Sequence, residues 1–405
     1  MTSAEQVKEL IAQGEGQRVE FVQEITPVPA IDLVAFANTN DGVILIGVQD
    51  DGQVCGVEGD PRRVEERLMG LCRVNCAPPL TPTVEVVHFE DKPVLVVQVR
   101  EDWRRKPYRA KGMCYVRAGS TSRRATQDEE YRLAQEAGRI IFDQSPIAKA
   151  TFADLDQAKL RRYLSTRLPN ALEANGRTIA QFIEHADLPF VVRHDDTLTP
   201  TLGGLLLFGQ QPQRFLPQAY LSAARFAGND IDVSALDRVT LRGTLDELIE
   251  QGLAFVQRNM RVASLLQDER LPYRTDVPEY PLRAAREAIT NAVVHRDYSY
   301  TGRDVVLRMF DDRLEIVSPG GLLPELTPDD LGTGKFASRN PTLAQAMREM
   351  GLAERFGTGV RLMRREMETN GSTPPIFTTE PDTFAVTLPA RELELWQNHG
   401  QRRYN

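Results

Sequence analysis

The apolar residues in the first third of the chain follow helix-type and strand-type spacings in turn. An amphipathic stretch ends in Ala35–Thr39, and after a short turn comes a nearly unbroken apolar run, Gly42–Val48. This order predicts a helix followed by a buried strand. Two further runs, Thr83–His88 and Pro93–Val99, predict a hairpin, and Met113–Arg117 predicts another strand.

Helical spacing is more frequent in the rest of the chain. A helix is expected over Thr126–Phe142, with Thr126 as its N-cap and Glu129 three residues later, the arrangement of a capping box. Further helices are expected at Asp154–Thr166, Thr178–His185, Gly243–Val262, Pro281–His295, Leu343–Met350 and Gly359–Thr369, and further strands at Leu205–Phe208, Tyr220–Phe226, Val305–Phe310, Arg313–Val317 and Phe384–Leu388. This mixture predicts the α/β class, of α+β type.

The length of 405 residues predicts two or three domains. Their expected limits are residues 1–145, 146–270 and 271–392, the second being a connecting region with helices and some strands. Residues 393–405 are expected to form a poorly ordered tail.

The composition is that of a water-soluble globular protein, with 41% hydrophobic residues. No apolar run is long enough to cross a bilayer, and the first residues lack the basic and apolar regions of a signal peptide, so we expect a cytoplasmic protein without a membrane partner. The four cysteines fit a reducing compartment. Cys72 and Cys76 share a helical face, and this pattern favours buried free thiols over a metal site.

The formal net charge of −8 argues against a uniformly basic nucleic-acid binder, but it hides a local excess of positive charge. The segment Arg100–Arg124 holds nine lysines and arginines against two acids, interleaved with aromatic residues. Cations bind phosphates and aromatic rings stack on bases, so this pattern favours nucleic-acid contact, with a solvated loop and strand edge as the alternative. The candidate contact residues are Arg104, Arg105, Lys106, Tyr108, Arg109, Lys111, Arg117, Arg123 and Arg124.

Three acids near the N-terminus form a second candidate site. Glu15 and Glu20 lie five residues apart, and Asp50 follows the strand expected at Gly42–Val48. Carboxylate oxygens are the ligands that hard divalent cations prefer. The three side chains therefore either converge on a metal ion or are solvated acids at the ends of an ordinary α/β unit.

Residues 10–140 resemble the Schlafen-type, AlbA-like nucleic-acid-binding domain. The resemblance rests on the following matches: Glu15-x4-Glu20-Phe21, Ala35-Phe36-Ala37-Asn38-Thr39, Gly42 with Ile44–Val48, Asp50, Lys106-Pro107-Tyr108 and Tyr115-Val116-Arg117-x-Gly119-Ser120. In nuclease members of this family two glutamates and an aspartate form a metal-dependent active site, so the resemblance implies Glu15, Glu20 and Asp50 as ligands of Mg²⁺ or Mn²⁺ and as catalytic residues. The family often has a lysine at the position of Val22. That cation is missing here unless Lys106 or Arg109 replaces it, and both cleavage and binding without cleavage remain open.

The run Arg286–Asp297 looks like the N-box of the GHKL ATPases, because Glu287 and Asn291 lie four residues apart on one helical face. In that family the asparagine ligates nucleotide-bound Mg²⁺ and the glutamate orients water. The run Glu354–Val360 resembles a later glycine box. The resemblance implies a nucleotide site, with ATP and Mg²⁺, formed by Glu287, Asn291, Gly320, Gly321, Gly357, Thr358 and Gly359. The family's adenine-reading aspartate is replaced by Ser318-Pro319-Gly320-Gly321, so a degenerate fold that serves dimerisation or sensing is the alternative.

Together the segments resemble bacterial ATP-binding transcriptional regulators. Three hypotheses follow. The first is a homo-oligomeric regulator that binds RNA or DNA and responds to a nucleotide. The second is a Mg²⁺- or Mn²⁺-dependent endoribonuclease or deoxyribonuclease that uses Glu15, Glu20 and Asp50. The third is a non-catalytic oligomeric scaffold.

Overall fold

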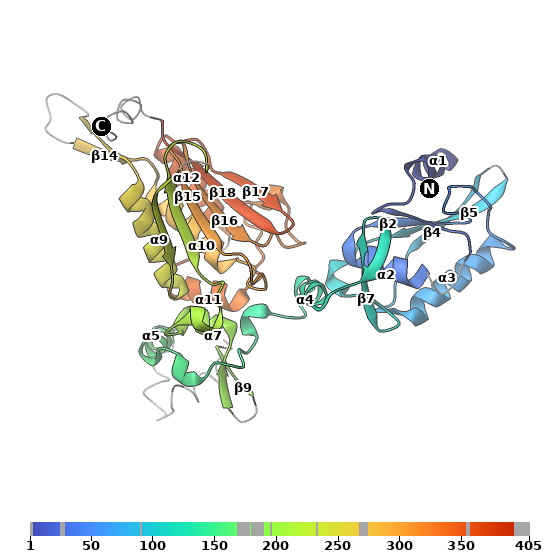
Figure 1. Cartoon of the computed structure of the whole chain (residues 1–405), viewed down its shortest axis with the longest axis horizontal. Coiled ribbons are helices and arrows are strands. Elements are labelled where there is room, and N and C mark those ends of the chain that lie inside the picture. Colours follow the sequence, from blue (N-terminus) through green and yellow to red (C-terminus); the bar gives the residue numbers. More distant parts are fainter. Residues whose placement is uncertain are drawn as a thin grey trace. The chain divides into compact units, whose positions relative to one another are not determined.

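The computed structural model describes residues 3–24, 29–89, 91–167, 179, 190–194, 197–231, 234–266, 274–353 and 357–392. The chain divides into two compact units, Met1–Ile140 and Ile141–Asn405 (Figure 1). Helices and strands occur together in both units, which confirms the predicted α/β class. None of the helices in the described ranges is long and apolar enough to cross a membrane.

The first unit contains two small sheets. One has the strand order β1-β2-β5-β4, in which β1 and β2 are parallel, and the other is antiparallel with the order β3-β6-β7-β8. The strands are β1 (Val19–Val22), β2 (Gly42–Ile46), β3 (Cys76–Ala77), β4 (Thr83–Phe89), β5 (Lys92–Val99), β6 (Arg109–Ala110), β7 (Met113–Ala118) and β8 (Thr121–Arg124). The helices are α1 (Ala4–Gln13), α2 (Pro29–Thr39), α3 (Pro61–Asn75) and α4 (Gln127–Glu136), with a 3-10 turn η1 at Trp103–Arg105.

The C-terminal end of α2 is anchored to β7 and to the segment before β6 by a buried amide. The Asn38 Nδ2 atom donates to the carbonyls of Tyr108 (2.9 Å) and Tyr115 (2.8 Å), and its Oδ1 accepts from the Tyr108 amide (2.8 Å). Next to it, the Thr39 hydroxyl accepts from the Arg117 amide (2.9 Å). Buried backbone groups need such partners, so the Asn-Thr pair fixes the place of α2 against the second sheet.

The second unit is built on one six-stranded sheet with the order β12-β11-β15-β16-β18-β17, in which only β11 and β15 are parallel neighbours. The second unit also has two separate two-stranded sheets, β9–β10 and β13–β14. The strands of the second unit are β9 (Val191–His194), β10 (Thr197–Pro200), β11 (Leu221–Phe226), β12 (Ala235–Leu241), β13 (Val262–Leu266), β14 (Arg274–Pro278), β15 (Val305–Met309), β16 (Arg313–Pro319), β17 (Ile376–Glu380) and β18 (Thr383–Pro389). Its helices are α5 (Gln157–Arg167), α7 (Leu202–Phe208), α8 (Pro212–Phe215), α9 (Leu245–Asn259), α10 (Leu282–Val294), α11 (Pro341–Glu349) and α12 (Gly359–Thr369), with 3-10 turns η2 (Phe142–Gln144), η3 (Phe152–Asp154) and η4 (Pro328–Asp330).

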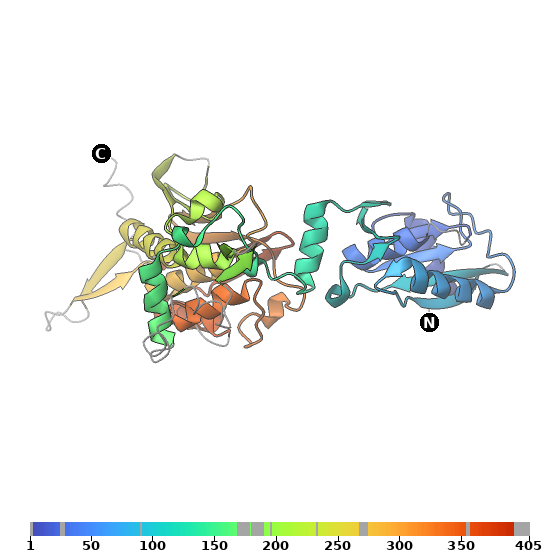
Figure 2. The same ribbon diagram turned by 90° about the horizontal axis from the view of Figure 1, so that it is seen from below.

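The helices α9, α10 and α12 lie together on one side of this sheet (Figure 1). The hairpin β13–β14 extends outward from the sheet-and-helix body of the second unit (Figures 1 and 2). Leu307 and Ile316 on the sheet and Ala288 and Ile289 on α10 belong to one buried apolar cluster. The helical layer therefore packs against the apolar face of the sheet, as expected for a two-layer domain.

One end of the second unit's helical layer is fixed by polar contacts. At the C-terminal end of α10, the buried Asn340 donates through Nδ2 to the carbonyls of Val294 and Arg296, both at 2.8 Å. These bonds satisfy carbonyls that lack partners within the helix and place the start of α11 beside its end.

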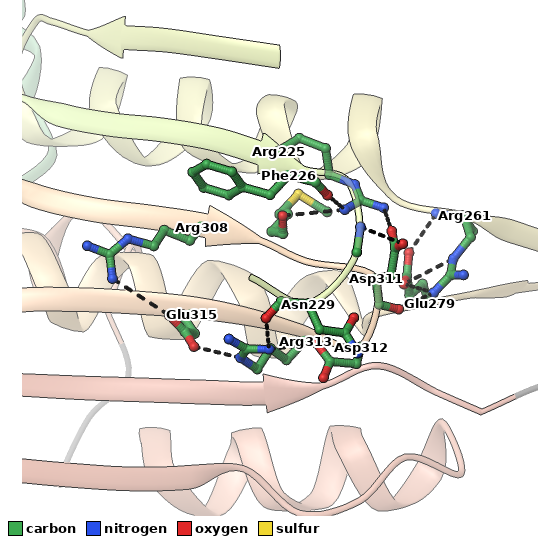
Figure 3. Close-up of polar contacts among 12 residues, drawn as sticks. Arg225, Phe226, Asn229, Arg261, Glu279, Arg308, Asp311, Asp312, Arg313 and Glu315 are labelled. Carbon is green, nitrogen blue, oxygen red and sulfur yellow. Dashed lines mark hydrogen bonds and ion pairs between the residues drawn. The ribbon is translucent and has the colours of Figure 1, made fainter. Parts of the chain in front are cut away.

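A network of ion pairs surrounds the turn between β15 and β16 (Figure 3). Asp311 pairs with Arg225 at the end of β11, and its carbonyl accepts from Arg261 (2.6 Å). Arg261 in turn donates through Nε to the buried Glu279 (3.1 Å). The network thus ties the base of the β13–β14 hairpin to the ends of the interior strands β11 and β15.

Most predicted elements are confirmed. The hairpins become β4–β5 and β15–β16, α12 has the predicted limits Gly359–Thr369, and α4 begins with the predicted capping box of Thr126 and Glu129. The α4 helix ends at Glu136 instead of Phe142, because Gly138 takes a positive φ of 67° two residues later. The predicted helix Thr178–His185 and the tail 393–405 lie outside the described residues, apart from residue 179.

The predicted strand Leu205–Phe208 is wrong, because these residues belong to helix α7. The Thr201 hydroxyl caps the helix by accepting from the Gly204 amide (3.1 Å), and a Cβ at Gly204 would lie 2.1 Å from the carbonyl oxygen of Phe190. Every residue of α7 is buried. A helix buried on all sides shows no periodicity, so its short apolar run cannot be told from a strand.

We expect Asn38→Ala to destabilise the first unit by about 3 kcal/mol, because it leaves three buried backbone groups without partners. Hydrogen exchange of the full chain should show protection of the β6 and β7 amides falling about 100-fold, which is the same free energy as a ratio. The control is Asn40→Ala, two residues later, which should change protection little. Equal protection in the two variants would contradict the anchoring role of Asn38.

Candidate functional site

The predicted glutamate Glu20 lies on β1 beside an unexpected partner. Its Oε2 atom is 2.8 Å from Nη1 of Arg117, on β7, and the same nitrogen is 3.7 Å from Oδ1 of Asp32, in the first turn of α2. The guanidinium is fully buried, stacks on the Phe36 ring at 4.6 Å and donates to the carbonyl of Gly16 (2.6 Å). Arg117 is therefore the cation beside Glu20, the role for which the sequence left Lys106 and Arg109 as candidates.

The two carboxylates of this site share one guanidinium, and their pKa values respond to that arrangement. Burial, and then the charges of Asp32 and Glu15, raise the pKa of Glu20 to about 7 against the opposing effect of Arg117. Burial also raises the pKa of Asp32, while Ser122 and Arg117 lower it. A carboxyl group with a pKa near neutral pH can both donate and accept a proton, which is typical of functional sites.

The other two predicted acids are placed differently. Glu15 is close enough to influence Glu20, but its Oε1 atom accepts from the Phe21 amide (3.1 Å). Asp50 is exposed in the turn that follows β2. Within the described ranges, no three acidic, histidine or cysteine side chains are gathered as ligands of a metal ion. The structure thus brings Glu20 together with Asp32 and does not gather Glu15, Glu20 and Asp50 into one ligand set.

The basic segment is less available than its charge count suggests. Lys106, Tyr108 and Arg117 are buried, and each of these side chains contributes to the interior. Lys106 pairs with Glu101, and Arg109 and Arg123 pair with Glu130 and Glu129. The exposed candidates that pair with no acid among the described residues are Arg104, Lys111 and Arg124, while Arg105 is half-buried.

The predicted buried free thiols are confirmed. Cys72, Cys76 and Cys114 are buried and free, and Cys55 is free and half-buried. Burial raises the pKa of Cys72 to about 11 and that of Cys76 to about 12, so neither is a thiolate at neutral pH.

The second unit contains a cavity of about 500 Å³, within the range of roughly 300–1,000 Å³ typical of small-molecule sites. One stripe of α10 forms a wall of it, made of Glu287, Thr290, Asn291, Val294 and His295. These positions differ by three and four residues, so they share one helical face. The N-box spacing read from the sequence therefore lies along the cavity wall.

The side chains of the stripe are oriented by each other. Asn291 donates through Nδ2 to Oε1 of the buried Glu287 (3.0 Å). This bond makes Oδ1 the amide atom available to a cation, which is the atom that a magnesium ion would take. When bound, such an ion would supply charge neutralisation for phosphate groups.

The predicted glycines Gly320, Gly321, Gly357 and Gly359 also line the cavity, and Thr358 lies between two of them. A Cβ at Gly359 would lie 1.9 Å from Oε1 of Glu287, and one at Gly321 would lie 2.2 Å from a carbonyl oxygen of β17. The glycines are needed because the loops pass this close to their neighbours. Residues 354–356 of the predicted glycine box lie outside the described residues.

Ser318, which stands where the GHKL family carries an aspartate, has its hydroxyl engaged. Its Oγ atom donates to the carbonyl of Ala292 on α10 (2.8 Å), and the side chain is buried. The wall around it is apolar, with Ile316, Phe384 and Val386. No carboxylate replaces the missing aspartate at this position.

Sequence reasoning missed Asp32. The signal was present, because Asp32 is the one acid in an otherwise apolar helix, Pro29–Ala37. A charge buried in such a stretch needs a partner of opposite sign. That partner, Arg117, is 85 positions later and could not be identified without the packing of α2 on β7.

Three family models match separate segments of the chain. Residues 15–126 match "Schlafen, AlbA_2", and residues 302–388 match "Putative ATP-dependent DNA helicase recG C-terminal". Residues 131–222 match a domain of unknown function. A search of curated proteins finds no match.

Two solved structures are similar to parts or all of the chain. One, a protein of Corynebacterium diphtheriae, is 21% identical with a TM-score of 0.47, and the match covers 97% of this chain and 81% of that one. The other is the N-terminal domain of a RecG-related protein of Nitrosomonas europaea, 29% identical with a TM-score of 0.25, covering 31% of this chain and 95% of that domain.

The segment matches agree with the motifs in both units. The resemblance of the first unit to the Schlafen AlbA_2 family, and of the C-terminal segment to an ATPase-related family, is thereby confirmed.

Proposed function

We propose that this protein binds nucleic acid through its first unit and a nucleotide in the cavity of its second unit. The observation that carries the proposal is the gathering of Glu287, Asn291 and the glycines of two separate loops around one cavity of about 500 Å³. Backbone amides at such glycines can approach phosphates closely. ATP with Mg²⁺ is the ligand expected from the ATPase-related match.

The proposed nucleic-acid contact is supported by the exposed basic side chains around the ribbon of strands β6, β7 and β8. Lys111 lies in the turn between β6 and β7, and Arg124 lies opposite Tyr115 in the register of β7 and β8. Arg104 extends over the Trp103 ring at 5.3 Å, in the turn that precedes β6. Cations on a ribbon with neighbouring aromatic rings suit a phosphate backbone and stacked bases.

A regulatory function is the finer part of the proposal. In it, nucleotide binding in the second unit changes the affinity of the first unit for RNA or DNA. Homo-oligomer formation and a cytoplasmic location remain predictions from the sequence.

We expect the triple variant Arg104→Gln, Lys111→Gln, Arg124→Gln to bind DNA about 10-fold or more weakly at 0.1 M salt. The slope of log affinity against log salt should fall by about 2–3, because each lost phosphate contact contributes roughly 0.7–0.9. Fluorescence anisotropy with duplex and single-stranded oligonucleotides measures both quantities. A charge-matched control removes three exposed bases of the second unit, Lys149, Arg286 and Arg365; an equal loss in the control would refute the proposed surface.

Asn291→Ala should weaken binding of ATP with Mg²⁺ about 10-fold or more, since it removes the amide oxygen offered to the ion. Calorimetric titration of the full chain, with Mg²⁺ and with EDTA, measures the effect. Affinity in EDTA should change much less. Arg286→Gln, on the exposed face of the same helix, is the control. If Asn291→Ala leaves the Mg²⁺-dependent affinity for ATP unchanged, the proposed nucleotide site is wrong.

Metal-dependent cleavage is a second candidate function, and the pairing of Glu20 with Asp32 favours it. Magnesium is commonly held by one or two carboxylates together with substrate phosphates, so two acids suffice once nucleic acid is bound. Arg117, whose guanidinium is fully buried, would hold the two carboxylates in place. This site differs from the one expected from the sequence, because Asp32 takes the place of Asp50.

With Mn²⁺ and single-stranded RNA or DNA, we expect Glu20→Gln and Asp32→Asn to abolish cleavage, and Asp50→Asn to leave it unchanged. The pKa of Glu20 is raised to about 7, and only its ionised form binds metal. The rate should therefore rise about 10-fold per pH unit below pH 7 and level off above it. Gel analysis of end-labelled substrates gives the rates. Absence of cleavage by the wild-type chain at pH 8 would eliminate this candidate.

A further inference from the structure

The two ends of the α10 stripe differ in charge. At one end Glu287 lies against Gly359, the first residue of α12, and accepts from the Asn291 amide. At the other end the stripe finishes with His295, which follows the last residue of α10 and is exposed to the cavity. A ligand that spans the cavity therefore meets different chemistry at each end.

Three basic side chains line the cavity near the C-terminal end of α10. They are His295, Arg339 and Arg348. Desolvation in the cavity, and then the charges of Arg339 and Arg348, lower the pKa of His295. The two arginines are thus close enough to His295 to act on it, and the ring is neutral at pH 7.

Two acids near these side chains have partners of their own. Arg339 pairs with Asp297 at 3.1 Å and also donates to the Gly321 carbonyl (3.1 Å). Glu349 accepts from the Tyr163 hydroxyl and the Gln345 amide.

Farther along the cavity wall, Lys335 pairs with Asp330 (2.9 Å). Arg348, in the last turn of α11, has no acidic partner within the described part of the chain.

Two hydroxyls in the same cavity wall lack hydrogen-bond partners among the described residues. The Oγ of Ser338 and the Oγ1 of Thr290 are both buried and unpaired, and Thr290 is only 1% exposed. Buried hydroxyls without a partner are uncommon and point to a group that supplies one. Both residues line the cavity.

We infer that the end of the cavity formed by His295, Ser338, Arg339 and Arg348 is an oxyanion subsite that takes a phosphate group of the ligand. An arginine fork, a hydroxyl and a ring N–H match the oxygens of a phosphate. The inference rests on the proposed nucleotide site and narrows its ligand. With one phosphate accepted through Mg²⁺ at Asn291 and another one helical turn later, beside His295, the ligand is a nucleotide that carries at least two phosphate groups.

Adenosine 3′,5′-bisphosphate, 5′-AMP and inorganic phosphate are suitable probes for the full chain. The bisphosphate should bind about 10-fold or more tightly than 5′-AMP by calorimetry. Arg348→Gln should remove that difference and Arg348→Lys should restore part of it, since the lysine keeps the charge. Arg365→Gln, an exposed arginine on α12 that does not line the cavity, should keep the full difference.

The His295 ring supplies a second readout by NMR. Inorganic phosphate should raise the pKa of His295, because a neighbouring anion favours the charged ring. The same titration should succeed in Asn291→Ala, in which the Mg²⁺-dependent site is damaged. Equal affinity for the bisphosphate and 5′-AMP, or an unchanged His295 pKa in the presence of phosphate, would overturn the subsite.

These outcomes separate the two proposals. Loss of Mg²⁺–ATP binding with an intact phosphate response leaves the subsite standing and removes the nucleotide site. An absent phosphate response with intact ATP binding does the reverse. Thermal melting of Arg348→Gln and Arg348→Lys verifies that both variants remain folded, and the lysine variant decides the matter if the glutamine variant does not fold.

Discussion

The arrangement of the first unit depends on one buried cation. A guanidinium cannot give up its proton in a protein, so Arg117 must be surrounded by acceptors wherever it is buried. Glu20, Asp32 and the Gly16 carbonyl supply them, and the Phe36 ring covers its face. This single requirement draws together β1, the start of α2 and β7. Removing either acid would leave a buried charge under-compensated, which costs several kcal/mol more than an exposed pair of the same geometry.

The same cation explains why the family motifs have the residues they have. Within α2, Asp32, Phe36 and Thr39 are spaced by four and three residues, so all three face β7. Gly42 follows because a Cβ there would lie 2.1 Å from the Phe36 ring. The run through residues 35–42, which carries part of the family resemblance, is therefore accounted for by packing and hydrogen bonding. A catalytic role is not needed to explain it, and only the raised pKa of Glu20 points beyond architecture.

The sequence predicted local elements well and side-chain partners poorly. The capping box at Thr126 and the hairpin turns depend on neighbours in sequence, and they were found. The stripe of α10 was also found, because helical spacing is local. The pairing of Arg117 with Glu20 was not, since it joins strands in different sheets. Helix α7 was misread because complete burial removes the periodicity that distinguishes it from a strand.

Charge counting failed for the same reason. The sequence of the basic segment shows a strong excess of positive charge. In the folded structure, however, Lys106, Arg109 and Arg123 are each paired with a glutamate. Two of those glutamates, Glu129 and Glu130, lie in α4 and outside the window that was counted. At the cavity the net charge misleads in the opposite way. The chain as a whole is acidic, yet Arg348 forms no ion pair in the described ranges. A ligand interacts with the charges that remain after ion pairs have formed within the protein. Which charges remain can be known only from the folded structure.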